Sequence, residues 1–130
     1  MGNLLLTHEG RINRGKFWLA LVYYLLTMAI VGVVCFVLSL VIPGDPGSDG
    51  FSVSGARAIP FVIVVFAYLI FLCWSGICVG IKRFHDRNKS GWWILIQFVP
   101  VIGPFWYFVE AFCLKGTTGP NRFGPDPLQG

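Results

Sequence analysis

The stretch 82–93 (KRFHDRNKSGWW) concentrates the residue types that could do chemistry. A histidine beside a carboxylate, here His85 and Asp86, could act as an acid–base pair or bind a divalent ion. A metal site needs three or four ligands, but the only other histidine is His8. Adjacent helical residues also point about 100° apart. We therefore expect no metal, no cofactor and no catalytic residue, and we predict that the chain is not an enzyme. The expected role of Asp86 is internal: it pairs with Lys82, Arg83 or an arginine of residues 1–16 and holds the basic cluster in one shape.

The composition places these residues in a small chain that has too few charges for a surface facing water. Of the 130 residues, 55% are hydrophobic and only 12% are charged, whereas soluble chains carry about 25% charged residues. This composition excludes a soluble enzyme, a disordered chain and a secreted module held by disulfides. It indicates a single integral membrane domain over residues 1–130.

Three apolar runs predict an all-α membrane protein with three hydrophobic helical segments, at 17–42, 58–81 and 92–114. At about 1.5 Å per residue each run is longer than the ~30 Å hydrocarbon core of a bilayer. The first run exceeds the apolar stretch of a signal peptide, so we expect it to be a retained anchor. A basic arm (1–16) and a tail rich in Gly and Pro (115–130) flank the three segments.

The distribution of Lys and Arg predicts the orientation. The arm holds three basic residues and the loop 82–91 holds four, whereas the loop between the first two runs holds only Arg57. Because basic residues gather on the cytoplasmic side, we expect a multi-pass protein with a cytoplasmic N-terminus.

The third run leaves the side of the tail open, because Pro100 and Pro104 lie at its middle. Proline removes a backbone donor and kinks a helix. A kinked full span would place the tail outside. A re-entrant pair of half-helices would return it inside, which the charge rule favours, although irregular backbone in lipid must be shielded.

Glu110 is the lone carboxylate within an apolar run, and an acid inside a membrane is by default a functional hypothesis. It could serve a proton or cation pathway, or it could pair with a basic residue near the interface. Gly76 and Gly80 form a GxxxG pattern, which lets another helix of this chain or of a second copy approach closely.

Three stretches occur in order along the chain and include the one described first: 10–18 (GRINRGKFW), 82–93 followed by 100–103 (PVIG), and 116–127 (GTTGPNRFGPDP). Together they resemble the bacterial inner-membrane family catalogued as domain of unknown function 805. The resemblance covers about residues 10–127. One departure is Lys82, where the family pattern usually has arginine.

The resemblance implies a bacterial inner (plasma) membrane protein, and it implies no reaction. It also directs attention to one polar constellation, the predicted polar cap, made of Arg11, Arg14, Arg83, His85, Asp86, Ser90, Asn121, Arg122 and Asp126. If the arm, the loop 82–91 and the tail share a side, these residues could form a single cytoplasmic cap.

Our first functional hypothesis is a non-enzymatic accessory or interaction protein. Its basic and aromatic cap would contact anionic lipid headgroups, a membrane partner or a second copy; the net charge of +4 needs no nucleic-acid partner. The alternative is a small oligomeric transporter or channel that uses Glu110. A membrane-embedded hydrolase or transferase using His85 and Asp86 is the least favoured hypothesis.

Overall fold

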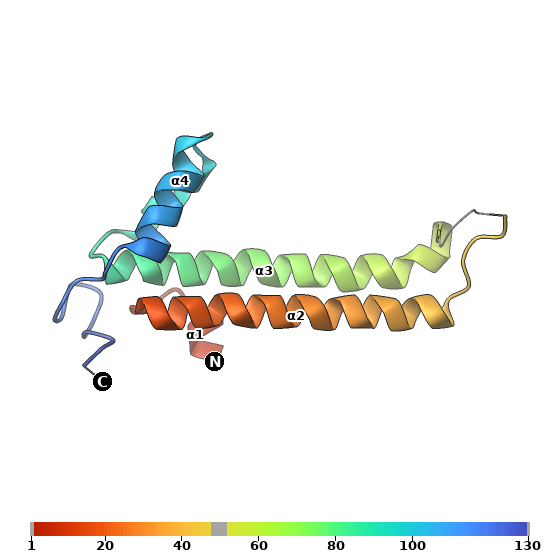
Figure 1. Cartoon of the computed structure of the whole chain (residues 1–130), viewed down its shortest axis with the longest axis horizontal. Coiled ribbons are helices and arrows are strands. Elements are labelled where there is room, and N and C mark those ends of the chain that lie inside the picture. The colour runs from red at the N-terminus through yellow and green to blue at the C-terminus, as the bar shows by residue number, and fades with distance from the viewer. Residues whose placement is uncertain (1, 48–51, 130) are drawn as a thin grey trace. The chain divides into compact units, whose positions relative to one another are not determined.

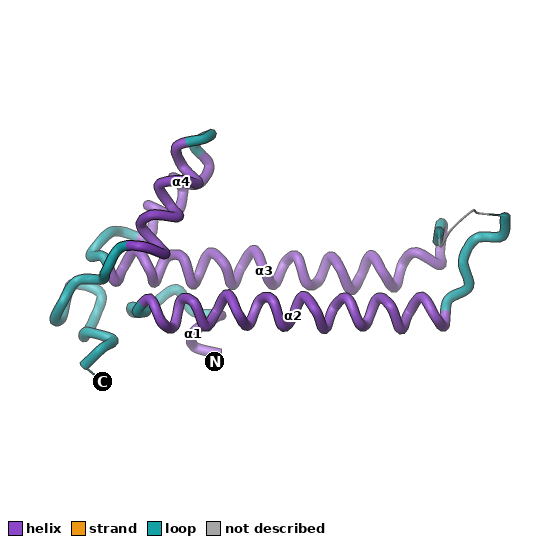
Figure 2. Tube along the Cα trace, viewed as in Figure 1, coloured by secondary structure: helices purple, strands orange, loops and turns teal. Residues whose placement is uncertain are grey.

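The computed structural model describes residues 2–47 and 52–129 (Figure 1), so residue 1 of the predicted arm and residue 130 of the predicted tail lie outside the described residues. Its helices are α1 (Gly2–Leu5), α2 (Arg14–Val41), the 3-10 helix η1 (Gly55–Ala58), α3 (Ile59–Asp86), the 3-10 helix η2 (Gly91–Phe98), α4 (Ile102–Phe108) and the π-helix η3 (Val109–Cys113). The described residues contain no strand, and Figure 2 shows the same helices along the Cα trace. The all-α prediction is confirmed.

Helix α2 begins where Asn13 caps it. The Asn13 side-chain oxygen accepts a hydrogen bond from the backbone N–H of Lys16 at 2.8 Å. This bond satisfies one of the amides that have no partner within the first turn of a helix. The helix then continues through 28 residues, about 42 Å, and ends shortly before Pro43. The predicted run 17–42 therefore lies almost entirely on one helix.

Helices η1 and α3 follow one another without a break and together span 32 residues, Gly55–Asp86. Pro60 lies in the first turn of α3, where its fixed φ of about −65° suits the helix. The helix continues five residues beyond the predicted run 58–81. Residues 82–86, expected at the start of a polar loop, are therefore the last helical turn of α3.

Helix α3 ends in a tight turn at Asn88. The backbone N–H of Lys89 donates to the carbonyl of Phe84, and that of Asn88 donates to the carbonyl of His85, both at 2.9 Å. Asn88 itself has a φ of 56°. This pair of bonds closes a helix through one residue in the left-handed region, where Gly is favoured and Asn is the next most common residue.

The turn yields a stability prediction at Asn88. Asn88→Gly is expected to retain or slightly raise the thermal unfolding temperature in detergent, because glycine adopts a positive φ without strain. Asn88→Val is expected to destabilise the protein by about 1–2 kcal/mol, since a branched side chain clashes in the left-handed region. Equal unfolding temperatures for the two variants would contradict the assigned turn.

Among the described residues, two helical stretches are long and apolar enough to cross a membrane: α2, and η1 with α3. In the most apolar 18-residue stretch of α2 no residue is buried, and in that of α3 only 17% are buried. Apolar helices without a protein cover need lipid or another chain around them. These two helices are the part of the three-segment prediction that the structure supports by length and composition.

The third apolar run is not one continuous helix. The chain passes from η2 through Pro100 and Val101 into α4, and Val101 has a φ of 66°. The N–H of Gly103 donates to the carbonyl of Val99 at 2.9 Å, and a Cβ added to Gly103 would overlap the carbonyl oxygen of Ile96. The start of α4 therefore lies directly against η2. Whether residues 92–114 enter a membrane, kinked or re-entrant, stays a prediction.

The chain groups into two compact units. The first unit comprises Met1–Val22 and Cys73–Gly130, and the second comprises Tyr23–Leu72, so the boundaries fall within α2 and α3. In the second unit, the hydroxyl of Tyr68 donates to the carbonyl of Tyr24 at 3.0 Å and lies 3.1 Å from the hydroxyl of Thr27. Polar contacts of this kind join neighbouring helices in membranes.

The first unit has a small apolar core. Phe84 is almost fully buried and its ring contacts that of Tyr107, while Phe17 packs edge-on against Phe112 at 4.9 Å. Of the two glycines predicted to aid helix packing, Gly80 lies against Ile94 and Tyr107 of the same chain. Gly76 has no atom within 4 Å of an added Cβ.

Candidate functional site

The centre of the candidate site is Asp86, the last residue of α3, whose side chain is only 4% exposed. Its two carboxylate oxygens bind two different guanidinium groups. Arg11 donates to Oδ1 through Nε at 3.2 Å and Nη2 at 3.1 Å, and Arg83 donates to Oδ2. Both arginine side chains are 1% exposed. We call these three residues the buried triad.

One carboxylate cannot neutralise two guanidinium groups, so backbone carbonyls supply the remaining acceptors of Arg83. Its Nε donates to the carbonyl of Ala111 at 2.8 Å, and its Nη2 donates to that of Leu114. These carbonyls lie at the end of η3, where helical carbonyls lack partners and favour positive charge. Arg83 therefore fastens the end of η3 to the end of α3.

Arg11 fastens the tail in the same way. Its Nη1 donates to the carbonyl of Gly119 at 2.8 Å, and its Nη2 donates to that of Thr117 at 2.6 Å. Thr117 in turn binds the backbone carbonyl of Asp86 through its N–H at 2.9 Å and its hydroxyl at 2.8 Å. The arm, the end of α3 and the tail thus share one hydrogen-bonded network, as buried charges require.

The tail is shaped by its own side chains. Asn121 donates to the carbonyl of His85 at 2.9 Å, and its side-chain oxygen accepts from the N–H of Phe123. The carboxylate of Asp126 accepts from the N–H groups of Gly119 at 2.8 Å and Leu128 at 2.9 Å. These two amides hold the pKa of Asp126 below its ordinary value.

The lowered pKa of Asp126 predicts how the tail responds to acid. A depressed pKa in the folded state means that the ionised group stabilises the fold fully above its ordinary value of 3.8, and that this contribution disappears as the pH falls through the folded value. Hydrogen-exchange protection of the Gly119 and Leu128 amides should therefore be constant from about pH 7 to pH 5 and fall below about pH 4. Asp126→Asn should remove this acid step, and a step that persists in the variant would assign it to another group.

His85 is held by stacking as well as by hydrogen bonding. Its ring lies 3.9 Å from that of Phe123, with the planes 5° apart, and its Nδ1 lies 3.3 Å from the carbonyl of Gly10. Arg122 also lies on the Phe123 ring and donates to the carbonyl of Asn88 at 3.1 Å. Since a carbonyl only accepts, Nδ1 carries the proton in this contact.

A second ion cluster surrounds Glu110 on η3, whose side chain is 5% exposed. Its two oxygens lie 2.5 Å from Nζ of Lys89 and 2.6 Å from Nε of Arg87. The Lys89 ammonium also lies over the Trp93 ring at 4.7 Å. The lone acid of the third apolar run is therefore paired with two cations of the loop that follows α3.

Most residues of the predicted polar cap come together around the buried triad. This holds for Arg11, Arg83, His85, Asp86, Asn121, Arg122 and Asp126. Arg14 is exposed and donates to the carbonyl of Cys113 at 3.1 Å. Ser90 instead directly precedes η2 and, with His85, lines a separate cavity of about 460 Å³.

Three residues contribute to the site in ways that sequence reasoning did not predict. Thr117 was not singled out, although it binds both Asp86 and Arg11. Gly116 is required because a Cβ there would overlap the carboxylate of Asp86, and the conspicuous GT pair at the start of the tail motif was the available signal. Lys82 donates to the carbonyl of Leu4 at 3.2 Å, so it anchors α1.

The described residues contain no group of three His, Cys, Asp or Glu side chains that could hold a metal ion. The expectations that the chain binds no metal and no cofactor and performs no catalysis remain predictions. The arrangement that is present consists of ion pairs and hydrogen bonds that hold three separate segments together.

The fold and the site define a class: helical proteins with two helices suited to crossing a membrane and a buried polar network at the end of α3. The chain belongs to the family described as "protein of unknown function (DUF805)", whose model matches residues 5–125. This match confirms the resemblance found in the sequence.

Three relatives from Escherichia coli K12 are similar over most of their length. The inner membrane protein YhaH is 31% identical over 120 residues, covering 92% of this chain and 85% of the relative. The inner membrane protein YhaI is 31% identical over 122 residues, covering 94% and 86%. The uncharacterized protein YiiR is 23% identical over 146 aligned residues, again covering 94% and 86%. No solved structure matches the chain.

Proposed function

We propose that this protein is a non-enzymatic accessory protein of the bacterial inner membrane. In this proposal it is multi-pass with a cytoplasmic N-terminus, and its basic and aromatic cap contacts anionic lipid headgroups. The names of the two relatives YhaH and YhaI support the location. The excess of Lys and Arg in the arm and in residues 82–91 supports the orientation.

One observation carries the proposal: the buried triad binds the arm and the tail to the end of α3. The charges of the triad are satisfied internally, so they are not available to lipid. The cap that meets lipid would consist of the exposed basic residues around it, namely Arg14, Lys16, Lys115 and Arg122. Each basic residue near an anionic surface contributes about 1 kcal/mol.

The same network favours the re-entrant interpretation of residues 92–114. The chain leaves the end of α3 at Asp86 and returns to it at Leu114, where Arg83 binds the carbonyl. The apolar side chains near the turn are highly exposed, with Phe98 at 74% and Val101 at 86%. In this proposal they lie in lipid, and the tail emerges on the cytoplasmic side beside the arm.

The transporter hypothesis is not favoured, because Glu110 is paired with Lys89 and Arg87. A group that carries protons or cations must exchange partners. Here two cations occupy both oxygens of the carboxylate.

Brominated lipids test the proposed function directly, because they quench tryptophan fluorescence only when they lie beside the protein. Trp92 directly follows the loop 82–91 and, at 79%, is the most exposed of the five tryptophans, which makes it a suitable reporter. We expect brominated phosphatidylglycerol, which is anionic, to quench at a lower mole fraction than brominated phosphatidylcholine. This preference should weaken as salt is raised, since exposed charges are screened.

Charge variants make the test specific to the cap. Replacing Lys16 and Arg122 together by glutamine is expected to reduce the preference for the anionic lipid. The matched control is Arg57→Gln, because the Arg57 side chain is also exposed, at 51%, but lies in η1, directly before the start of α3. Equal quenching by the two lipids in the unmodified protein would overturn the proposal.

A further inference from the structure

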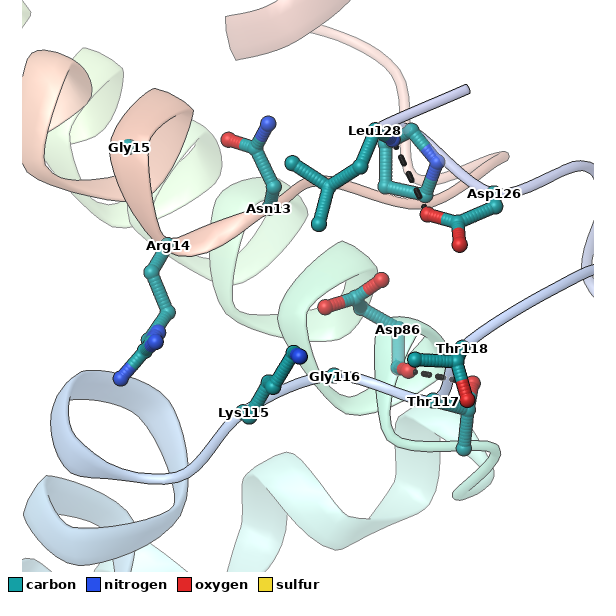
Figure 3. Close-up of a pocket in the computed structure, with 11 residues that line it drawn as sticks. Asn13, Arg14, Gly15, Asp86, Lys115, Gly116, Thr117, Thr118, Asp126 and Leu128 are labelled. Atoms are coloured by element: carbon teal, nitrogen blue, oxygen red, sulfur yellow. Dashed lines mark hydrogen bonds between the residues drawn. The ribbon is translucent and has the colours of Figure 1, made fainter.

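A cavity of about 300 Å³ opens beside the buried triad (Figure 3). The start of α2 lines it at residues 13–15, and the tail lines it at residues 115–118 and 126–128. It belongs to the first unit throughout. A volume of this size accommodates a group of small-molecule dimensions, at the lower end of the range for ligand pockets.

The walls of this cavity carry opposite charges. Arg14 and Lys115 lie on one side and Asp126 lies on the other, and the carboxylate of Asp86, which already binds Arg11 and Arg83, also lines the cavity (Figure 3). Arg14 and Lys115 are exposed, whereas Asp126 is 8% exposed. The Arg14 guanidinium donates one hydrogen bond within the described residues, to the carbonyl of Cys113. Its other N–H groups remain available to a ligand.

Asp126 is suited to bind a donor. Each of its oxygens accepts one backbone N–H, from Leu128 and from Gly119, and a carboxylate oxygen can accept a second hydrogen bond. Among the residues that the structure describes, no Lys or Arg nitrogen lies within 4.0 Å of this carboxylate. Arg11 and Lys115 are nearby positive charges that help to lower the pKa of Asp126, and an ammonium group that enters the cavity would add a cation in direct hydrogen-bonding contact with the carboxylate.

From these charges we infer that the cavity binds the phosphoethanolamine headgroup of a membrane lipid. The phosphate lies against Arg14 and Lys115, and the ammonium donates to Asp126. Thr118 supplies a further polar atom along the wall. This inference deepens the proposed function and rests on it, because it assigns one specific headgroup to a cap that is proposed to meet lipid.

Binding of short-chain lipids to the full-length protein in detergent tests the inference, with native mass spectrometry as the measurement. The probe is dihexanoyl phosphatidylethanolamine and the matched control is dihexanoyl phosphatidylcholine, which has the same charge but no N–H to donate. We expect about tenfold tighter binding of the ethanolamine lipid, the size of one charge-assisted hydrogen bond. Equal binding of the two lipids would overturn the inference.

Variants assign the binding to this cavity. Arg14→Gln and Lys115→Gln should each weaken binding of the ethanolamine lipid about tenfold, whereas Arg57→Gln should leave it unchanged. If Arg14→Gln has no larger effect than Arg57→Gln, the cavity is not the site. Inorganic phosphate that binds as tightly as the lipid would also overturn the inference, because it would assign the site to the free ion.

The two proposals can fail separately. A preference for phosphatidylglycerol in the quenching experiment without a preference for ethanolamine over choline would remove the headgroup pocket and leave the cap. A preference for ethanolamine over choline without a preference for phosphatidylglycerol would retain the pocket and remove the general attraction to anionic lipid.

Discussion

Asp86→Ala is expected to destabilise the protein by about 3–5 kcal/mol, the usual result of removing one partner from a buried ion pair. The substitution would leave Arg11 and Arg83 buried with no carboxylate between them. The loss should appear as a lower unfolding temperature in detergent. Faster hydrogen exchange is expected in the tail, because Arg11 would no longer be oriented toward it.

A matched control separates this effect from a general loss of negative charge. Asp45 forms an ion pair with Arg57 at 4.0 Å, and both side chains are partly exposed. Asp45→Ala should therefore cost at most about 1 kcal/mol. The stability of Asp86→Asn should be close to that of Asp86→Ala, since an amide offers only one acceptor oxygen to two cations. A stability of Asp86→Ala similar to that of the control would show that the triad does not hold the segments together.

Glu110→Gln is expected to have the second largest effect, a destabilisation of about 3 kcal/mol. The variant would leave Lys89 and Arg87 beside a neutral group that is 5% exposed. Denaturant unfolding in detergent would measure the loss. The exposed Glu9 provides a control, and Glu9→Gln should change the stability by less than about 0.5 kcal/mol.

The same variant separates the two functional hypotheses. If Glu110 is structural, the variant and the parent should show no difference in proton-coupled flux in proteoliposomes once the amounts of folded protein are matched. Unchanged stability together with abolished flux would favour the transporter hypothesis and contradict the assigned pairing.

The sequence predicted the long helices well because their physical cause is local. The absence of charge over 17–42 and 58–81 and the obligation of backbone in lipid to bond to itself leave few alternatives. The family motifs also pointed to residues that the fold brings near one another, such as Arg11, Asp86 and Asn121. Their types and order were visible in the sequence without any knowledge of which atoms meet.

The partners within the site could be narrowed from the sequence but not fixed, because each depends on contacts between distant segments. For Asp86 the sequence left Lys82, Arg83 or an arginine of the arm as candidates, and the fold shows that Arg83 and Arg11 bind it. The sequence left the extension of α3 through residue 86 open for a related reason. Charged residues are compatible with the last helical turn once the arm and the tail supply acceptors and counter-charges.

We expect the arm, the end of α3 and the tail to lie on one side of the membrane, where Asp86 joins them. Paired fusions at the C-terminus measure this, with one reporter that is active only in the cytoplasm and one that is active only outside. Activity of the cytoplasmic reporter alone is expected. Activity of the outside reporter would separate Arg11 from the tail by the whole bilayer and would rule out the buried triad as the link between them.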